Sequence, residues 1–281
     1  MISILVNGVV PDDPARAIAG DDRGLNYGDG LFETMLYRGG CVRLLDAHLC
    51  RLASGCARLG IAGPPEAVLR DDIRKVCAGA TDGVVKIVVT RGTGGRGYRP
   101  AADLCATRVV SLNAPPAPSG RQRANLRWCE TRLGRNPALA GMKHLNRLEQ
   151  VLAQREWNDP AIDPNVDEGL MLDTEGELIS ATMSNVFIVK CGAIVTPDLR
   201  FCGVRGVMRG EVLRAAHELG IPASEAALRP CDVENADEVF LTNAIRGIRS
   251  VAVLESTRKS TPKHWPPGSI TQTVAATLGV R

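Results

Sequence analysis

The sequence predicts two domains of mixed α/β and α+β architecture. Its 281 residues suffice for one large domain or two medium ones, each with its own hydrophobic core. Short apolar runs typical of strands alternate with amphipathic helical segments along the chain. Residues 114–120 (APPAPSG) have the composition of a linker. We therefore expect an N-terminal domain over residues 1–113, a linker over 114–121 and a C-terminal domain over 122–281.

The N-terminal domain is expected to begin with a β-hairpin. Residues 2–6 form the first strand, the Asn7-Gly8 pair the turn, and residues 9–10 the returning strand. Further along, Asp46 is the expected N-cap of an amphipathic helix that Gly60 ends. The remaining predicted elements are strands at 31–37, 41–45, 84–90 and 108–112, a helix at 65–77 and a glycine-rich loop at 91–97.

The C-terminal domain is expected to combine two helices with a set of short strands. Its first helix covers residues 145–156, and a second one covers residues 209–219 and ends at Gly220. A hairpin turn is expected at residues 174–176. The predicted strands are 169–173, 178–180, 186–189, 239–243 and 249–254.

Composition narrows the possible partners. The net charge of +3 comes without a Lys/Arg run, an RNA-binding signature or a zinc-ligand spacing, which argues against a nucleic-acid partner and a metal site. No apolar run reaches membrane-spanning length, and the first residues lack the pattern of a signal peptide. The nine cysteines are odd in number and spaced singly, which argues against a disulfide framework. A cytoplasmic location is the expectation.

Three groups of motifs occur in order along the chain. The first joins a glycine-rich segment to a helix motif, the second surrounds Lys143, and the third combines a Ser-Asn-Val-Phe segment with two later motifs. Their order and spacing resemble those of the fold type IV aminotransferases, a family of pyridoxal 5'-phosphate (PLP) enzymes, up to about Leu254. The matching segments are residues 22–34 and 48–52, residues 142–149, and residues 184–187, 203–209 and 241–244.

Two of these motifs narrow the resemblance. Residues 90–98 (TRGTGGRGY) and 143–149 (KHLNRLE), with the Asn243-Ala244 pair, are more similar to the aminodeoxychorismate lyases than to the aminotransferases. The resemblance implies a two-domain fold with the active site between the domains, a homodimer, and PLP as cofactor. It also implies a small-molecule substrate, 4-amino-4-deoxychorismate, which such lyases convert to 4-aminobenzoate and pyruvate in folate biosynthesis.

Lys143 is the first candidate catalytic residue. An amine nucleophile must lose its proton, and burial beside a cationic cofactor lowers a lysine pKa for that purpose. The resemblance makes Lys143 the lysine that attaches the cofactor, and its released amine would then take a proton from the amine-bearing ring carbon of the substrate. Outside its motif, Lys143 would read as a solvated lysine at the start of a helix.

The resemblance also assigns a cofactor phosphate site. Arg51 would offer paired, charge-assisted hydrogen bonds, although an ordinary surface arginine is the alternative. Val207 and Met208 precede a predicted helix, so their backbone N–H groups would point at an anion. Asn243 and Ala244, at a strand end, would form a third support, to which Ala244 contributes only its backbone.

Four residues are candidates for substrate contact. Arg96 lies in the glycine-rich loop, where it would pair with a carboxylate of the substrate, and Tyr98 lies beside it. The alternative for Arg96 is a solvated arginine at a flexible hairpin tip. Phe32 and Thr34 alternate along one predicted strand and therefore share a face. Phe32 would line the pocket, and Thr34 would hydrogen-bond near the reacting carbon as a second catalytic residue.

Ser180 marks a departure from the family pattern. In the aminotransferases an acidic residue stands five positions before the Asn of the Ser-Asn-Val-Phe segment and pairs with the pyridine nitrogen of PLP; here that position is Ser180. Without a carboxylate the cofactor is a poorer electron sink. Transamination depends on that electron sink more strongly than does a lyase reaction that ends in an aromatic product. A D-amino-acid or branched-chain aminotransferase and a non-catalytic PLP-binding protein remain the alternatives.

Overall fold

The computed structural model describes residues 3–95, 97–117, 121–157, 165–255 and 261–280. The chain divides into two compact units. Unit 1 comprises residues 1–117 together with Met142–Asn146, and unit 2 comprises residues 118–141 and 147–281. The change from the first unit to the second at Ala117 lies inside the expected linker. The return of residues 142–146 to unit 1 differs from the uninterrupted second domain that the sequence suggested.

Unit 1 contains a five-stranded sheet with the strand order β1-β5-β4-β2-β3. Every neighbouring pair in this sheet is antiparallel. The strands are β1 (Ser3–Val6), β2 (Gly30–Arg38), β3 (Cys41–Val42), β4 (Asp82–Thr90) and β5 (Thr107–Asn113). The helices are the 3-10 helix η1 (Pro14–Arg16), α1 (Arg23–Tyr27), α2 (Leu45–Leu59) and α3 (Glu66–Val76).

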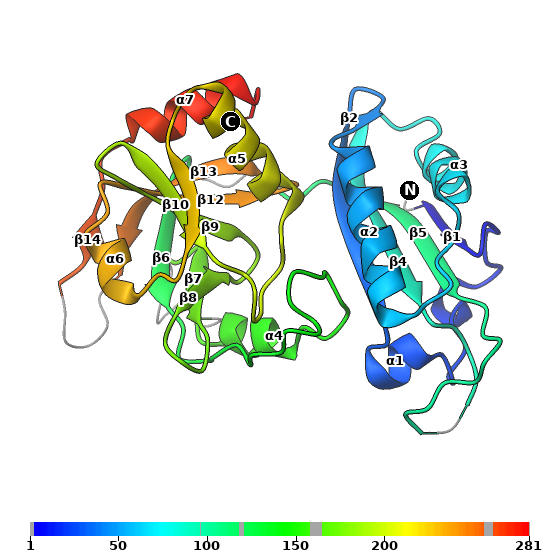
Figure 1. Cartoon of the computed structure of the whole chain (residues 1–281). Coiled ribbons are helices and arrows are strands. Elements are labelled where there is room, and N and C mark those ends of the chain that lie inside the picture. Colours follow the sequence, from blue (N-terminus) through cyan, green and yellow to red (C-terminus); the bar gives the residue numbers. More distant parts are fainter. Residues whose placement is uncertain (1–2, 96, 118–120, 158–164, 256–260, 281) are drawn as a thin grey trace. The chain divides into compact units, whose positions relative to one another are not determined.

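Helices α2 and α3 cover the same face of this sheet (Figure 1). The two central strands alternate in burial: Leu31 and Met35 of β2 are buried, and their register partners in β4, Val89 and Val85, are completely buried. On β5 the same face carries Arg108, the register partner of Val89, and Arg108 pairs with α3. The even-numbered residues of β2, including Phe32 and Thr34, therefore point to the opposite, more open face.

Three predicted features of unit 1 are wrong. Asp46 is not an N-cap, because α2 begins at Leu45 after Leu44, whose φ of 54° ends the preceding strand and whose side chain makes no capping bond. Asp46 instead lies in the first helical turn and pairs with Arg70. The early helix start also shortens the expected strand 41–45 to two residues. Residues 9–10 form no strand; β1 pairs with β5, and Val9 makes only an isolated bridge.

Unit 2 contains a nine-stranded sheet, with eight strands in the order β11-β10-β9-β12-β13-β6-β7-β8 and β14 paired to β13. The β13–β6, β6–β7 and β10–β11 pairs are parallel, and the others are antiparallel. The strands are β6 (Ala124–Trp128), β7 (Glu168–Leu172), β8 (Leu178–Ala181), β9 (Asn185–Lys190), β10 (Ala193–Pro197), β11 (Ala223–Ala226), β12 (Glu238–Asn243), β13 (Gly247–Leu254) and β14 (Lys263–His264).

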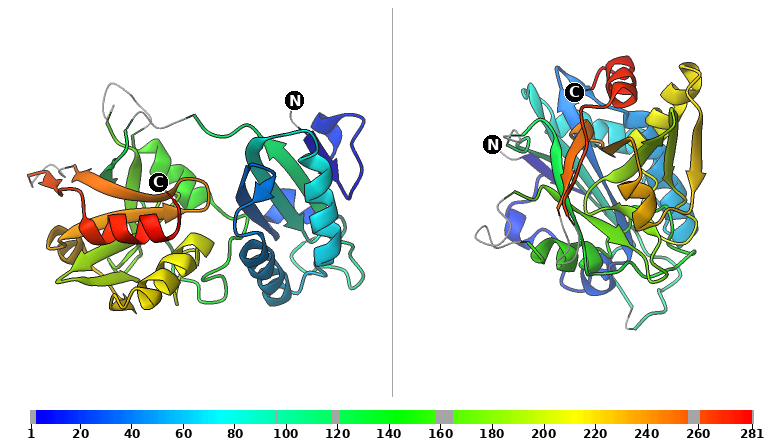
Figure 2. Two further views of the ribbon diagram at one scale, coloured as in Figure 1. Left: turned by 90° about the horizontal axis from the view of Figure 1, so that it is seen from above. Right: turned by 90° about the vertical axis from the view of Figure 1, so that its left-hand side faces the viewer.

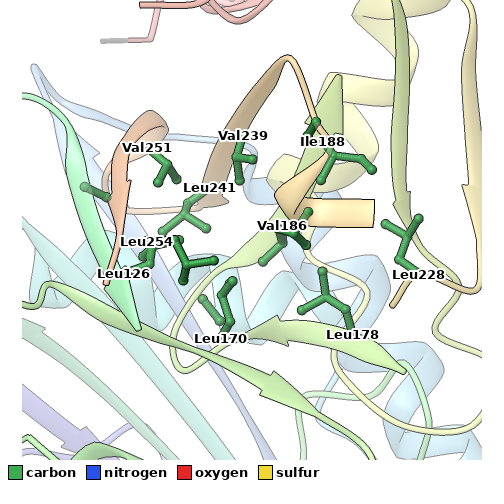
Figure 3. Packing of buried hydrophobic residues seen from close by; sticks show 14 of the residues in the cluster. Leu126, Leu170, Leu178, Val186, Ile188, Leu228, Val239, Leu241, Val251 and Leu254 are labelled. Atoms are coloured by element: carbon green, nitrogen blue, oxygen red, sulfur yellow. The ribbon is translucent and has the colours of Figure 1, made fainter. Parts of the chain in front are cut away.

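One buried cluster of unit 2 is built mainly from aliphatic side chains on these strands. Figure 3 shows Leu126, Leu170, Val186, Leu241 and Val251 converging from five different strands, all of them at most 1% exposed. Aromatic residues make up only 4% of the sequence, so branched aliphatic residues supply the apolar area that is buried. This core fixes the ends of β8, β9 and β12, where several candidate residues lie.

The described residues of unit 2 also form four helices. Helices α5 (Val207–Glu218) and α7 (Ser269–Thr277) lie side by side in both views (Figures 1 and 2). Helix α6 (Pro230–Glu234) is short. Helix α4 (Leu148–Arg155) begins three residues later than predicted, because the preceding residues 142–146 belong to unit 1.

Expectations from the sequence also concern membrane-spanning segments and disulfides. Among the residues that the structure describes, no helix is long and apolar enough to cross a membrane. All nine cysteines lie in the described ranges and are free thiols.

Candidate functional site

Lys143 lies in unit 1 in an extended segment beside the start of β2. The Phe32 amide donates to the Lys143 carbonyl and the Leu145 amide donates to the Gly30 carbonyl, both at 2.9 Å, with Leu31 and His144 forming the bridge between them. Antiparallel pairing sets Lys143 opposite Phe32 on the same face of the sheet. The Lys143 ammonium lies 4.4 Å from the centroid of the Phe32 ring, within range of a cation–π contact.

The same open face carries a second lysine. Thr34, two residues after Phe32 and half-buried, is the register partner of Lys86 on β4. The Lys86 ammonium lies 5.7 Å from the Phe32 ring centroid. Two cations therefore lie near one aromatic ring, with Thr34 on the same face, an arrangement suited to an anionic ligand. Sequence reasoning did not include Lys86 in the site, because the β2–β4 register that brings it there is not written in the local sequence.

Arg51 lies in a buried cluster on the helix-covered side of unit 1. Its Nε and Nη2 donate to the two oxygens of Glu33 at 2.8 and 2.6 Å, and Nδ1 of His48 lies 2.6 Å from the same carboxylate. His48 and Arg51 project from one side of α2, as three-residue spacing on a helix requires. Burial alone raises the pKa of Glu33, but hydrogen bonds from His48 and Arg51 hold that pKa below its usual 4.5. The guanidinium of Arg51 is thereby fixed in orientation.

The expected substrate loop is only partly described. Arg96 lies outside the described residues. Tyr98 is 88% exposed, and its ring meets the edge of Tyr27 with a centroid separation of 5.7 Å. The structure therefore places Tyr98 beside α1.

In unit 2, one dipeptide joins two of the predicted phosphate supports. The Ser184 hydroxyl oxygen accepts a hydrogen bond of 3.0 Å from the side-chain amide of Asn243. The next residue, Asn185, accepts from the Gly206 amide at 3.1 Å and donates to the Val204 carbonyl at 2.9 Å. Ser184 and Asn185 thus hold the end of β12 and the start of α5 in one place.

The start of α5 fits an anion. Val207 and Met208 are its first two residues, and the N-cap, Gly206, has no side chain to satisfy their N–H groups. Helix N–H groups and the helix dipole both favour a negative charge at such an end. A Cβ at Gly206 would lie 2.1 Å from Oδ1 of Asn185, so a glycine is required for this approach. This part of the structure fits the phosphate of PLP.

The side chain of Asn243 is hydrogen-bonded within unit 2. Its Oδ1 accepts hydrogen bonds from the backbone amides of Ile245 at 3.1 Å and Arg246 at 2.7 Å, and its Nδ2 donates to Ser184. The side chain therefore shapes the turn after β12. The next residue, Ala244, is half-buried.

Ser180 lies half-buried on β8, opposite Met171 of β7. The nearby Glu177 is committed to Arg135, with a separation of 2.8 Å. A buried acid that sequence reasoning missed is Glu168, which accepts from the Ser184 hydroxyl at 2.7 Å and from the Met183 amide at 3.0 Å. Burial raises the pKa of Glu168. The only feature of the sequence that could have indicated Glu168 is its position as a single acid just before the apolar run 169–172.

Comparison with known proteins identifies the family. Residues 30–254 match the amino-transferase class IV family. The chain belongs to this family. Its members are fold type IV enzymes that use PLP, and the α/β architecture with two sheets described above agrees with that fold. The N–H groups that begin α5 and the amine of Lys143 are the kinds of groups that PLP requires, a phosphate support and a nucleophile.

Several members of the family are similar over nearly their whole length. The aminodeoxychorismate lyase of Vibrio harveyi is 32% identical over 276 residues, which cover 97% of this chain and 98% of that one. The crystal structure of 4-amino-4-deoxychorismate lyase from Pseudomonas aeruginosa is similar with a TM-score of 0.89 and 43% identity, covering 98% and 97% of the two chains. A D-alanine aminotransferase of Bacillus licheniformis is 26% identical over 99% of this chain and 96% of its own.

Proposed function

We propose that this protein is a PLP-dependent carbon–oxygen lyase that converts 4-amino-4-deoxychorismate to 4-aminobenzoate and pyruvate, a step of folate biosynthesis. The observation that carries the proposal is the open face of unit 1, where Lys143 and Lys86 flank Phe32 beside Thr34. A primary amine there can attach PLP, and a second cation suits a substrate with two carboxylates. The identities to the lyases of V. harveyi and P. aeruginosa support the same assignment.

The proposal assigns a role to each candidate residue. Lys143 attaches the cofactor and, once released, its amine takes the proton from the ring carbon that bears the substrate amino group. The backbone N–H groups of Val207 and Met208 bind the phosphate, and Arg51 supplies a charge held by Glu33. When bound, PLP withdraws electrons from the carbon that carries the substrate amine.

The substrate side of the site is assigned to unit 1. Phe32 lines it, Thr34 offers a hydroxyl near the reacting carbon, and Arg96 and Tyr98 of the glycine-rich loop bind substrate. Lys86 adds a cation on the Phe32 face. Together these residues would hold an anionic ring with its amine directed at Lys143.

Ser180 favours elimination over transamination. No carboxylate occupies its position, and the acids nearby are engaged elsewhere: Glu177 with Arg135, and Glu168 with Ser184 and Met183. A neutral hydroxyl stabilises a pyridinium less than a carboxylate does. Elimination tolerates the weaker electron sink because loss of pyruvate leaves an aromatic ring.

A coupled assay tests the proposal. The PLP-loaded protein is mixed with chorismate, glutamine and an aminodeoxychorismate synthase, and 4-aminobenzoate is measured. We expect product with the wild type and none with Lys143→Ala. Lys190→Ala is the matched control, since Lys190 lies on the surface and pairs with Asp237. Absence of 4-aminobenzoate with fully loaded wild-type protein would refute the lyase assignment.

The alternative enzyme on the same fold is an aminotransferase for D-amino or branched-chain amino acids, supported by the similarity to the D-alanine aminotransferase of B. licheniformis. Mixing the protein with pairs of an amino acid and a 2-oxoacid, and following the pyridoxamine absorbance, separates the two activities. A non-catalytic PLP protein would bind the cofactor and turn over neither substrate. The homodimer that the resemblance implies is tested by sedimentation of the loaded protein.

A further inference from the structure

Arg23, which has no role in the proposed chemistry, is one of the most buried charged residues of unit 1. It begins the short helix α1 and is only 3% exposed. Its Nε donates to Asp29 at 3.1 Å, while Nη1 and Nη2 donate to the carbonyls of Gly97 at 3.0 Å and Tyr98 at 2.9 Å. Its guanidinium also lies 4.8 Å from the ring centroid of Tyr27. A single side chain thus binds two consecutive carbonyls of the glycine-rich loop.

The ion pair alone does not explain why this arginine is buried. Asp29 is shared with Arg91, whose Nε and Nη2 bind it at 2.7 and 3.0 Å and whose other contacts are the carbonyls at the end of α2. Taking an arginine out of water is expensive, and apolar replacements of buried ion pairs are often neutral or stabilising. What an apolar residue cannot supply is the planar fork of donors that spans two adjacent carbonyls.

The same short helix also holds the first part of the loop. The Arg23 amide donates to the Gly92 carbonyl at 2.9 Å. Its neighbour Asp22, 1% exposed, accepts from the Thr90 hydroxyl at 2.8 Å. The α1 segment therefore fixes the loop where it leaves β4, and the Arg23 side chain fixes it again at residues 97–98.

The aromatic contacts extend this anchoring to a proposed substrate residue. Tyr27 lies between the Arg23 guanidinium and the Tyr98 ring, with cation–π geometry on one side and an edge contact on the other. Tyr98 is otherwise 88% exposed. Its backbone carbonyl and its ring are therefore both held through Arg23 and Tyr27, although most of its side chain faces solvent.

We propose that Arg23 is a positioning residue that holds Tyr98 and the end of the glycine-rich loop in the geometry required for substrate binding. This inference rests on the proposed lyase function, because the substrate contact of Tyr98 belongs to it. Arg23 itself acts through the loop and does not contact substrate or cofactor. A loop held in place before binding loses less conformational entropy when the substrate arrives.

The test compares Arg23→Gln and Arg23→Lys with Arg16→Gln, a control at an arginine that is 87% exposed and pairs only with Asp13 among the described residues. Three quantities are measured for each PLP-loaded protein: kcat and KM in the coupled lyase assay, the PLP dissociation constant, and the rate of chymotrypsin cleavage after Tyr98. Cleavage is followed well below the melting temperature of each variant, so that global unfolding does not contribute.

We expect Arg23→Gln to raise KM about tenfold, with kcat changed less than about threefold and PLP affinity unchanged. Cleavage after Tyr98 becomes several-fold faster. Arg23→Lys retains the charge opposite Asp29 but lacks the planar fork of donors. Its stability therefore stays close to that of the wild type, while its KM and its cleavage rate lie between those of the wild type and Arg23→Gln. Should Arg23→Gln fail to fold, Arg23→Lys alone decides the matter.

Two results would overturn the inference. If both variants lower the melting temperature but leave KM and cleavage as in Arg16→Gln, Arg23 is structural only. If PLP affinity and kcat fall together while KM stays constant, Arg23 acts on the cofactor. Failure of the proposed function shows differently, as a wild type without 4-aminobenzoate formation; the cleavage rates then still decide whether Arg23 holds residues 97–98.

Discussion

Replacing Arg51 with alanine should affect both the stability of unit 1 and the binding of the cofactor. The substitution removes two charge-assisted hydrogen bonds, at 2.8 and 2.6 Å, from a carboxylate that is 1% exposed. Glu33 then retains only His48 as a side-chain partner among its described contacts. The variant therefore leaves the buried Glu33 carboxylate with one of the three side-chain hydrogen bonds described above.

The size of the stability loss follows from that burial. Removing one partner of a buried ion pair costs about 3–5 kcal/mol. Arg51 is 15% exposed and His48 still donates to Glu33, so we expect a loss of about 3 kcal/mol, at the lower end of that range. In the loaded protein the PLP affinity should fall by a further 1.5–3 kcal/mol, about the contribution of one hydrogen bond to a charged group.

The stability loss caused by Arg51→Ala should become smaller as the pH falls. The folded-state pKa of Glu33 lies below its usual 4.5, so the cluster contributes stability above that value and loses it as the pH falls through the lowered pKa. In Arg51→Ala the pKa of Glu33 rises. The stability difference between wild type and variant is therefore largest near neutral pH and shrinks as the pH falls below about 4.5.

Urea unfolding of the cofactor-free protein, followed by two probes, measures this difference. All three tryptophans, Trp128, Trp157 and Trp265, lie in unit 2, so their fluorescence reports that unit, whereas far-UV circular dichroism reports both. We expect the variant to shift the circular dichroism transition more than the fluorescence transition. Arg58→Ala, at an exposed position of the same helix, is the control. An unchanged transition at neutral pH, or a difference that grows on acidification, would refute the reasoning.

Four further predictions concern the site. Lys143→Ala should abolish the borohydride-reducible PLP adduct and product formation; a reducible adduct that persists at another single lysine would remove Lys143 from its role. Gly206→Ala places a Cβ 2.1 Å from Oδ1 of Asn185. It should weaken PLP binding about tenfold, which corresponds to the loss of one hydrogen bond to a charged group. Equilibrium titration measures the affinity, and an unchanged value would exclude the start of α5 as the phosphate support. Arg96→Ala should raise the KM for aminodeoxychorismate and leave the PLP spectrum intact, whereas loss of PLP with normal KM would reassign the loop. Ser180→Glu should raise half-transamination of D-alanine while lyase activity stays flat or falls, provided PLP occupancy, measured in parallel, is retained; equal rates of transamination and elimination in the wild type would contradict the argument from the weak electron sink.

The features that the sequence predicted well are those that depend on local periodicity. Phe32 and Thr34 share a face because strand side chains alternate with a period of two. His48 and Arg51 project from the same side of α2 because they are three residues apart on a helix. A helix after Gly206 was predicted because a glycine precedes a helical pattern, although α5 begins at Val207, two residues earlier than expected. None of these conclusions needs information about distant parts of the chain.

The features that were missed depend on pairing between distant segments. Residues 145–147 have a helical composition, yet Leu145 pairs with Gly30 of β2, so the helix begins only at Leu148. Lys86 joins the site through its register with Thr34. Glu168 and Ser184, sixteen residues apart, meet across a loop. The bonds of Asn243 to Ser184 and to the turn that follows β12 could not be read from the local sequence either. In each case a tertiary contact outweighs the local pattern.

The return of residues 142–146 to unit 1 has a consequence for the order in which the protein matures during synthesis. Residues 1–117 emerge from the ribosome first, with the amide and carbonyl of residues 30–32 still lacking the strand that Lys143 and Leu145 provide. An unpaired edge of this kind can pair with other chains. Unit 1 therefore cannot be completed until the first strand of unit 2 has also been made, and a fragment that stops at the linker should be more prone to aggregation than the whole chain.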